Sequence, residues 1–336
     1  MRAYIIRRLL LMIPTLWILS ILVFLSVRFI PGDAIDVWVA KMAAYGEALQ
    51  DYDREDFMRF LGLDVPVYVQ YGRWIGVLPT PDWVTGEPYF RGLLQGTLGE
   101  SMGGSAASIE ERLIGRLPVT IQLGVMAIVI GLLIALPVGI YSAIRQDTAA
   151  DYAGRTTGII GMSVPNFWLA IMVMIYPVVW WGWSPPLEWV PFTEDPLGSL
   201  KGLLIPSLIL GTGMSAGTMR LTRTTMLEVL RQDYIRTAWS KGLNERVVVM
   251  RHAVKNALIP VVTVIGMQLP LLVGGSVIIE NIFNLPGVGR LFLTALVDRD
   301  YPMVSGVNLF LATVVVAANL IIDLIYPYLD PRVRYS

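Results

Sequence analysis

Six long runs of apolar residues, none of which contains a charged side chain, divide this chain. Each run is close to or above the roughly 20 residues that an α-helix needs to cross a bilayer. None alternates apolar and polar residues as a transmembrane β-strand does. The pattern therefore predicts an all-α integral membrane protein with six transmembrane helices. The predicted spans are residues 9–27, 119–144, 156–184, 202–219, 256–279 and 301–322.

The first run has a second interpretation as a signal peptide, because Arg2, Arg7 and Arg8 precede its apolar residues. The run is longer than the apolar part of a signal peptide. Residues 27–31, at and just after its end, also do not resemble a small-residue cleavage site. We therefore expect a retained helix.

Lysine and arginine residues predict the orientation, because they gather in the short cytoplasmic loops of membrane proteins. With the N-terminus in the cytoplasm, the inner segments hold 15 Lys and Arg residues. The two short outer loops then hold only Lys201, Arg290 and Arg299. We expect a multi-pass protein of the cell (inner or plasma) membrane with both termini in the cytoplasm.

Two connections are too long to be simple turns, and they define the domain organisation. Residues 1–29 form the N-terminus and first transmembrane helix, and residues 30–118 form an extracytoplasmic cap between helices 1 and 2. Residues 119–336 form the core of helices 2 to 6. A cytoplasmic loop at residues 220–256 lies between helices 4 and 5.

The cap has an acidic composition, with 13 Asp and Glu residues against 7 Lys and Arg residues. We expect a small folded unit of short helices. Ser108 and Glu111 have the spacing of a capping box, which predicts a helix that leads into the second span. Residues 79–83 and 99–108 are rich in turn-forming residues and are expected to be loops.

The composition supports a membrane protein and excludes several chemistries. Hydrophobic residues make up 55% and charged residues 15% of the 336 residues, and the mean hydropathy is +0.61. The net charge of zero argues against a generally basic nucleic-acid binder. The lack of cysteine and the single histidine, His252, leave no pair of such ligands for a metal. No lysine follows a glycine, so the chain has no Walker A loop for ATP.

The loop at residues 220–256 has the most informative pattern. Asp233 can cap the start of a short helix, and Gly242 can end that helix in a left-handed conformation. Asn244 can then cap a second short helix over residues 246–255. The sequence therefore predicts two short amphipathic helices at an angle, directly before the fifth span.

Two interpretations of this helix pair stay open. Ile235 and Trp239 lie one turn apart on the same face of the first helix. A basic amphipathic pair can rest on anionic lipid headgroups, and periodicity alone favours that interpretation. Alternatively, the pair is a docking element for a soluble partner, with Trp239 as its buried anchor.

The same loop resembles the cytoplasmic "EAA" loop of permease subunits of ABC importers. The resemblance covers residues 233–243 and 251–260 and is greatest to the branch that imports dipeptides, oligopeptides and nickel. Arg236 and Thr237 stand where the general motif has Glu and Ala, and Trp239 is unusually bulky.

Further segments resemble the same family in the same order along the chain. The cap alone diverges clearly, since Thr97 stands where a Gly-Asp-Leu-Gly run is usual. The matching segments are residues 7–10 with Pro31-Gly32-Asp33, residues 116–120, 163–168 and 285–290, and Asp323, Tyr326, Asp330, Pro331, Arg332 and Arg334.

The resemblance implies a permease subunit of an ATP-driven importer that takes up peptides from an extracytoplasmic binding protein by alternating access. Its implied partners are a homologous second permease, two ATPase subunits that bind ATP and Mg, the binding protein and the lipid bilayer. It implies no enzyme activity, metal or cofactor in this chain and no nucleic-acid partner. Close relatives import oligosaccharides or nickel chelates, so these substrates stay open. The implied ATPase-coupling residues are Tyr234, Arg236, Thr237, Ala238, Trp239, Ser240, Lys241, Gly242 and Leu243.

Neutral polar residues within the predicted spans are candidates for a translocation path. Such residues also form hydrogen bonds between neighbouring helices, which is the more common arrangement. The candidates are Gln122, Asn166, Gln268 and Asn308, with Asn319 as a further polar residue.

Three rival functional classes are weaker. An ion-coupled secondary carrier needs charged groups within its spans, and Asp323 near the inner end of the last span is the single marginal candidate. An intramembrane enzyme needs paired catalytic residues at membrane depth. A membrane scaffold or receptor needs no helix pair on its inner side.

Overall fold

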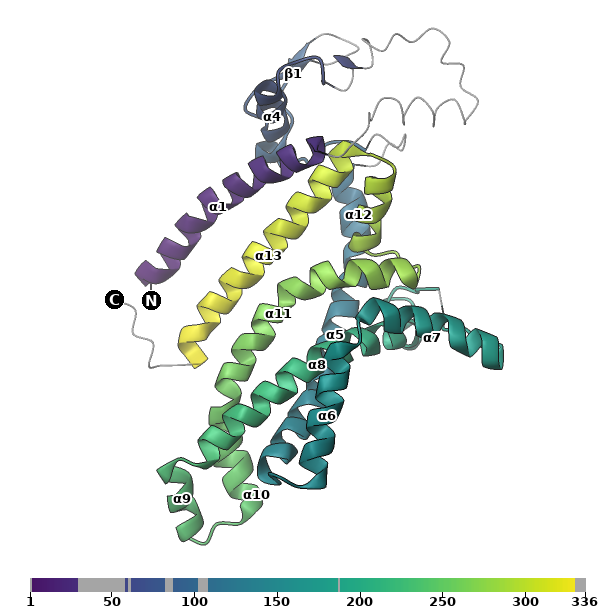
Figure 1. The fold of residues 1–336 in the computed structure, drawn as a ribbon. Coiled ribbons are helices and arrows are strands. Elements are labelled where there is room, and N and C mark those ends of the chain that lie inside the picture. Colours follow the sequence, from purple (N-terminus) through teal and green to yellow (C-terminus); the bar gives the residue numbers. More distant parts are fainter. Residues whose placement is uncertain are drawn as a thin grey trace. The chain divides into compact units, whose positions relative to one another are not determined.

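The computed structural model describes residues 2–29, 58–59, 62–81, 87–101, 108–186 and 188–329 (Figure 1). These residues are almost entirely helical, which confirms the predicted fold class. The α-helices are α1 (Arg2–Arg28), α4 (Val67–Ile75), α5 (Ile109–Ile144), α6 (Ala149–Ser163), α7 (Asn166–Trp181), α8 (Pro196–Leu230), α9 (Asp233–Ser240), α10 (Glu245–Val247), α11 (Val254–Ile282), α12 (Val288–Val297) and α13 (Tyr301–Leu329).

Three kinds of short element complete the described chain. A 3-10 helix covers Leu93–Gln95, and a π-helix covers Val248–Ala253 between α10 and α11. Strands β1 (Thr80–Pro81) and β2 (Pro88–Tyr89) pair in antiparallel fashion.

Five helical segments of the described chain are long and apolar enough to cross a membrane, and a sixth span results if α6 and α7 are counted together. The segment that reaches furthest beyond its prediction is α8, which continues past residue 219 to Leu230. Its start is fixed by Asp195, whose carboxylate accepts from the N–H groups of Leu197 and Gly198. Pro196 occupies the first helical position, where the missing N–H costs nothing.

The continuous third span predicted over residues 156–184 is wrong. The chain breaks between α6 and α7, whose axes differ by 89°. Val164 has extended backbone angles, with φ −91° and ψ 117°. Pro165 explains the break, because the residue before a proline is driven out of the helical region and proline has no N–H to donate.

The described chain forms two compact units. One consists of Pro118–Gly289 with Met1–Arg8 and Val315–Ser336, and we call it the core unit. The other consists of Leu9–Leu117 and Arg290–Val314, and we call it the cap unit.

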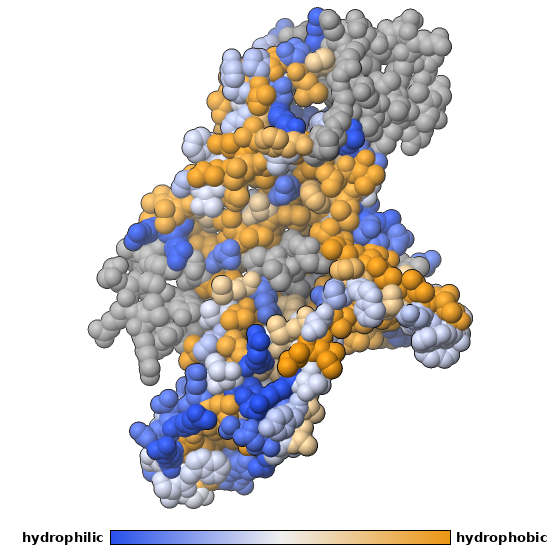
Figure 2. Space-filling view, in the orientation of Figure 1, coloured by the Kyte–Doolittle hydropathy of each residue, from blue (hydrophilic) through white to orange (hydrophobic). Residues whose placement is uncertain are grey.

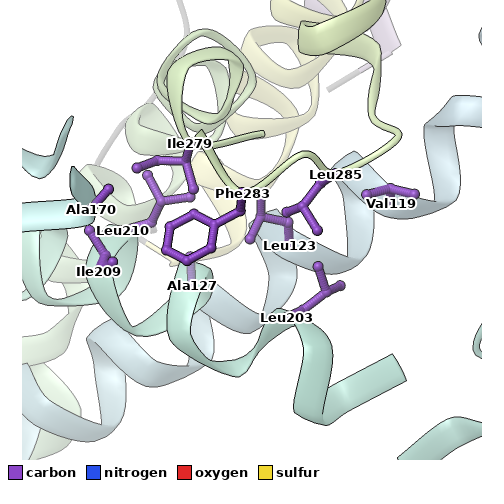
Figure 3. Close-up of a cluster of buried hydrophobic side chains, with 10 residues drawn as sticks. All are labelled: Val119, Leu123, Ala127, Ala170, Leu203, Ile209, Leu210, Ile279, Phe283 and Leu285. Atoms are coloured by element: carbon purple, nitrogen blue, oxygen red, sulfur yellow. The ribbon is translucent and has the colours of Figure 1, made fainter. Parts of the chain in front are cut away.

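Buried side chains from α5, α7, α8 and α11 form the main hydrophobic cluster of the core unit (Figure 3). The Phe283 ring is fully buried in its middle. Leu123 and Leu285 lie on one side of the ring, and Ile209 and Leu210 lie on the other. The cluster therefore packs α5, α7, α8 and the end of α11 around one aromatic side chain.

Two glycines allow α5 and α8 to approach each other closely. A Cβ atom on Gly211 would lie 2.7 Å from the carbonyl oxygen of Ala127, and one on Gly131 would lie 3.0 Å from the carbonyl oxygen of Gly211. Small residues at such crossings let helix backbones pack in membranes.

Gly211→Ala is expected to lower the melting temperature of the purified protein, because the added methyl group forces the two helices apart. Overpacking of this kind costs about 1–3 kcal/mol. Gly217→Ala on the same helix is the matched control, since nothing lies within 4 Å of its Cβ position. A helical glycine replaced by alanine without a clash gains up to about 1 kcal/mol. Thermal unfolding of both variants checks this, and equal shifts would contradict the close approach.

In the cap unit, aromatic side chains pack α4 against the end of α1. The Phe24 ring lies 5.1 Å from the Tyr71 ring and 5.5 Å from the Trp74 ring, between centroids. The hydroxyl groups of Ser20 and Tyr71 are hydrogen-bonded at 2.8 Å. These contacts with α1 therefore stabilise the short helix α4.

Two expectations for the cap are corrected or confirmed. The loop predicted over residues 79–83 is wrong at Thr80 and Pro81, which form strand β1 and pair with β2. Turn propensity does not reveal this pairing, because the partner strand lies further along the chain. Trp83 lies outside the described residues. The predicted helix start is confirmed, since α5 begins at Ile109 and the Ser108 hydroxyl accepts from the Glu111 N–H at 3.3 Å.

Candidate functional site

The short helix α9 is the first part of the candidate coupling site. The N–H groups of Ile235 and Arg236 bond to the carbonyl oxygen of Gln232. Gln232 therefore occupies the cap position, and it makes no side-chain capping bond. The prediction that Asp233 caps this helix is wrong by one residue, because Asp233 is already helical.

The end of α9 agrees with the sequence. Gly242 has a left-handed backbone with φ +73°, and its N–H bonds to the carbonyl oxygen of Trp239 at 2.9 Å. Asn244 then caps the next helix, because its side-chain oxygen accepts from the Arg246 N–H at 3.1 Å. Both turn assignments are confirmed.

The second short helix predicted over residues 246–255 is wrong. The chain runs from α10 through the π-helix and into α11 without a break. No glycine or proline stands between Asn244 and Pro260 to stop it. The fifth span and the second half of the coupling loop are therefore one continuous helical segment (Figure 1).

The two faces of α9 differ sharply in burial. Ile235 is 0% exposed and Ala238 is also buried, and both belong to a hydrophobic cluster with Met226 of α8 and Val248 of the π-helix. Trp239 is 43% exposed. Its predicted position on the same face as Ile235 suggested that both side chains would be buried, and Trp239 is not. The Trp239 indole therefore lies on the surface of a helix that Ile235 and Ala238 hold against the core unit.

The nine predicted coupling residues are brought together on one short segment. Ala238 is buried, and the other eight are exposed. Tyr234 is tied to the start of α11, since its hydroxyl accepts from the Asn256 side chain at 2.9 Å. Hydrophilic side chains gather over the end of the molecule that carries α9 and α10 (Figure 2). The exposed members are Tyr234, Arg236, Thr237, Trp239, Ser240, Lys241, Gly242 and Leu243.

A buried ion pair joins α6 to α8 on the same side of the core unit. Asp151 is 0% exposed, and its two carboxylate oxygens accept from Nε and Nη2 of Arg223 at 2.8 and 2.9 Å. Arg155, one turn along α6, also donates to Asp151 at 3.1 Å. Thr148 caps α6 by accepting from the Asp151 N–H.

Sequence reasoning missed this ion pair, since it counted the Lys and Arg residues of the inner segments only to predict the orientation. The available signal was local: Thr148 and Asp151 have the spacing of a helix start, and Arg155 follows Asp151 by four residues. The contribution of Arg223 comes from packing, because 72 residues separate it from Asp151.

Three of the four predicted pathway residues lie against α8. The Ser199 hydroxyl donates to the side-chain oxygen of Gln122 at 3.0 Å, and the Gln268 amide donates to Thr218 at 3.4 Å. The Asn166 side chain lies so close to Gly213 that a Cβ there would be 2.4 Å from its oxygen.

The pathway role of these residues stays a prediction, because each of the three contacts is also an interhelical contact of the usual kind. Asn308 belongs to α13 in the cap unit, and Asn319 further along α13 is exposed. Asp323 is a residue of α13 whose side chain lies outside the described part of the structure.

A second buried carboxylate was also missed. Glu280 near the end of α11 is fully buried, and the Thr120 hydroxyl of α5 donates to it at 2.8 Å while accepting from the Val288 N–H at 2.9 Å. A Cβ atom on Gly287 would lie 2.3 Å from the Glu280 carboxylate carbon. The glycine-containing turn before α12 is therefore folded tightly around this side chain.

Residues 135–335 match the family model described as binding-protein-dependent transport system inner membrane component. The chain belongs to this family. The resemblance to ABC-importer permeases is thereby confirmed, and the subunits of this family are transport proteins of the membrane.

Relatives along the full length of the chain are named as peptide permeases. The oligopeptide transport system permease protein AppB of Bacillus subtilis is 36% identical over 337 residues, with all of both chains covered. A putative peptide transport system permease protein of Brucella abortus is 40% identical over 336 residues. The dipeptide transport system permease protein DppB of Escherichia coli is 34% identical over 359 residues. The latter two alignments also cover all of both chains.

A solved structure shares the fold. The crystal structure of an amino acid ABC transporter with histidines aligns with a TM-score of 0.51 at 12% identity. The alignment covers 65% of this chain and 94% of that chain. At this identity the likeness shows the fold alone.

Proposed function

We propose that this chain is the transmembrane permease subunit of an ATP-driven importer for peptides that an extracytoplasmic binding protein delivers. The observation that carries the proposal is the similarity over the whole chain to permeases named for oligopeptide and dipeptide transport. The surface of α9 supports it, since Ile235 and Ala238 fix the helix by their burial while the exposed Trp239 side chain is suited to docking.

The proposed complex contains this chain, a homologous second permease, two ATPase subunits that bind ATP and Mg, and the binding protein. The family description supports the last of these, because it names binding-protein-dependent transport. Both termini and α9 lie in the cytoplasm in this proposal. The charge distribution of the loops supports that orientation.

In the proposed mechanism, α9 sits in a groove of one ATPase subunit and moves with it. Its buried face contacts α8 and the π-helix through Ile235 and Ala238, so a displacement of α9 reaches two membrane helices directly. ATP binding and hydrolysis in the partner subunits then alternate the access of the shared pore between the two sides of the membrane. The work of this chain is mechanical and involves no covalent chemistry.

Transport by the reconstituted complex tests the function. Proteoliposomes that contain this chain with its permease and ATPase partners should accumulate a labelled dipeptide or oligopeptide. Uptake should require both the binding protein and ATP on the side of the membrane where the ATPase subunits lie. Uptake of oligosaccharide or a nickel chelate in place of peptide would change the substrate and keep the architecture. Uptake driven by an ion gradient without ATP would contradict the proposal.

Gly242→Val is expected to reduce peptide uptake several-fold in these proteoliposomes while ATP hydrolysis continues. A β-branched residue is a strong outlier at positive φ, and the left-handed region costs L-residues about 1–2 kcal/mol. Nothing lies within 4 Å of the Cβ position, so the effect comes from the backbone at the end of α9. Gly242→Asn is the control, because asparagine adopts this conformation readily. Wild-type uptake by Gly242→Val would remove this turn from the coupling mechanism.

A further inference from the structure

The segment that leads into the fifth span carries two cations on one exposed face. Arg251 belongs to the π-helix and Lys255 to the first turn of α11, and both side chains are exposed. Residues four apart along a helical segment lie on the same face. The guanidinium and ammonium groups therefore share one patch of surface.

The opposite face of this segment is buried, and this burial fixes the direction of the cations. Five of its apolar side chains belong to the hydrophobic cluster that also holds Ile235 and Ala238 of α9. Rotation of the segment about its axis would expose them, so the two cations stay directed away from the core unit. The five are Val248, Val249, Ala253, Val254 and Ala257.

Neither Arg251 nor Lys255 has an acidic partner within the part of the chain that the structure describes. Glu245, the acidic residue of α10, pairs instead with Arg145 at 3.4 Å. Like charges one turn apart on a helix repel each other. An anion bound between the two groups removes that repulsion, so the pair is suited to a negatively charged ligand.

The position of the pair along the chain corresponds to the lipid headgroups. Lys255 is the last charged residue before the 24 uncharged residues 256–279. A span needs about 20 such residues, so the hydrocarbon layer begins within roughly one turn of Lys255. Arg251 lies about 6 Å further out along the axis. The headgroup layer is about 5–8 Å thick on each side, so both cations fall within it.

Two neighbouring side chains suit a phospholipid. The Tyr234 hydroxyl accepts from the side chain of Asn256 at 2.9 Å, directly after Lys255 in the sequence. A tyrosine hydroxyl both accepts and donates, so its own proton can be donated to a phosphate oxygen. Met250, beside Arg251, is an exposed apolar side chain. A lipid covers such a side chain at the membrane boundary, whereas a small soluble anion does not.

We propose that Arg251 and Lys255 bind the phosphate group of an anionic phospholipid, with the Tyr234 hydroxyl as a neutral donor and Met250 against the lipid. Basic residues immediately beside a span commonly recognise such headgroups. The proposal concerns lipid binding alone and does not depend on the transported substrate. It assigns the basic face to the bilayer and leaves the exposed Trp239 indole to the proposed docking.

Native mass spectrometry of the purified full chain tests the site. The protein in detergent is equilibrated with equal amounts of phosphatidylglycerol and phosphatidylcholine that have the same acyl chains. A basic residue beside an anionic surface strengthens binding roughly fivefold, so the pair is expected to give at least about a tenfold preference for phosphatidylglycerol. Equal retention of the two lipids would overturn the proposal.

Substitution locates the binding. The double variant Arg251→Gln with Lys255→Gln is expected to lose the preference for phosphatidylglycerol. Arg231→Gln with Lys241→Gln is the matched control, because it removes the same charge from two exposed residues outside this face. An unchanged preference in the first variant, or a lost preference in the control, would refute the assignment. If the first variant does not fold, Lys255→Gln alone is expected to lower the preference roughly fivefold, and no change would refute it.

Two competition experiments identify what binds. An excess of inorganic phosphate is expected to leave the phosphatidylglycerol bound, and its complete displacement would show a site for free phosphate and overturn the lipid assignment. Addition of the proposed ATPase subunits is also expected to leave the lipid bound. Displacement by those subunits would assign the basic face to a protein partner and overturn the proposal.

Discussion

A complex that carries Trp239→Asp in this chain is expected to lose peptide uptake while the ATPase subunits still hydrolyse ATP. Trp239 is 43% exposed on α9, so in the proposed complex it is an anchor for the ATPase groove. Exposed tryptophans that become buried at interfaces commonly contribute 2 kcal/mol or more. That corresponds to a loss of at least roughly 30-fold in the docking equilibrium. Uptake and ATP hydrolysis measured on the same proteoliposomes give the result.

Two variants of the same helix separate docking from folding. Trp239→Phe keeps an aromatic anchor and is expected to retain most of the uptake. Ile235→Ala removes a fully buried side chain from the opposite face, and it is expected to cost about 2–5 kcal/mol in stability. Its melting temperature should therefore fall, whereas that of Trp239→Asp should stay near the wild-type value. Full uptake by Trp239→Asp would mean that α9 does not dock through this residue.

Asp151→Asn is expected to be the most destabilising single substitution at the α9–α10 end of the core unit. The change leaves the Arg223 guanidinium, which is 17% exposed, without its charged partner. Breaking a buried ion pair by removing one partner costs about 3–5 kcal/mol. Asp147→Asn is the matched control, because its side chain is 64% exposed and lies 3.4 Å from Arg155. An exposed ion pair of this kind contributes only about 0–1 kcal/mol.

Thermal unfolding in detergent or nanodiscs compares the two asparagine variants. The double variant Asp151→Asn with Arg223→Gln is expected to recover part of the lost stability, because it removes the unpaired charge as well. Similar melting temperatures for Asp151→Asn and Asp147→Asn would show that the α6–α8 ion pair is not important for stability.

The features that sequence reasoning predicted correctly depend on short stretches of chain. The apolar runs, the left-handed Gly242, the Asn244 cap and the Ser108 cap each follow from residues within a few positions of one another. Membrane solvation reinforces the helices formed by the apolar runs, because backbone polar groups within the bilayer have to be hydrogen-bonded within the protein.

The features that it missed depend on contacts between distant segments or on competing local effects. Pro165 looked like one residue of a long apolar run, yet it outweighed hydrophobicity and divided the third span. Glu280 lay just beyond the predicted fifth span, and only the fold brings Thr120 and the turn at Gly287 to its carboxylate. The strand at Thr80–Pro81 needed a partner that the sequence does not identify.

The unbroken passage from α10 through the π-helix into α11 has a mechanical consequence. At about 1.5 Å per residue, the segment from Glu245 to Gln268 is roughly 35 Å long. A tilt of about 10° imposed at the end that carries α10 would displace the other end by roughly 6 Å. A single stretch of helical backbone therefore converts a small displacement at α10 into a larger displacement further along the span.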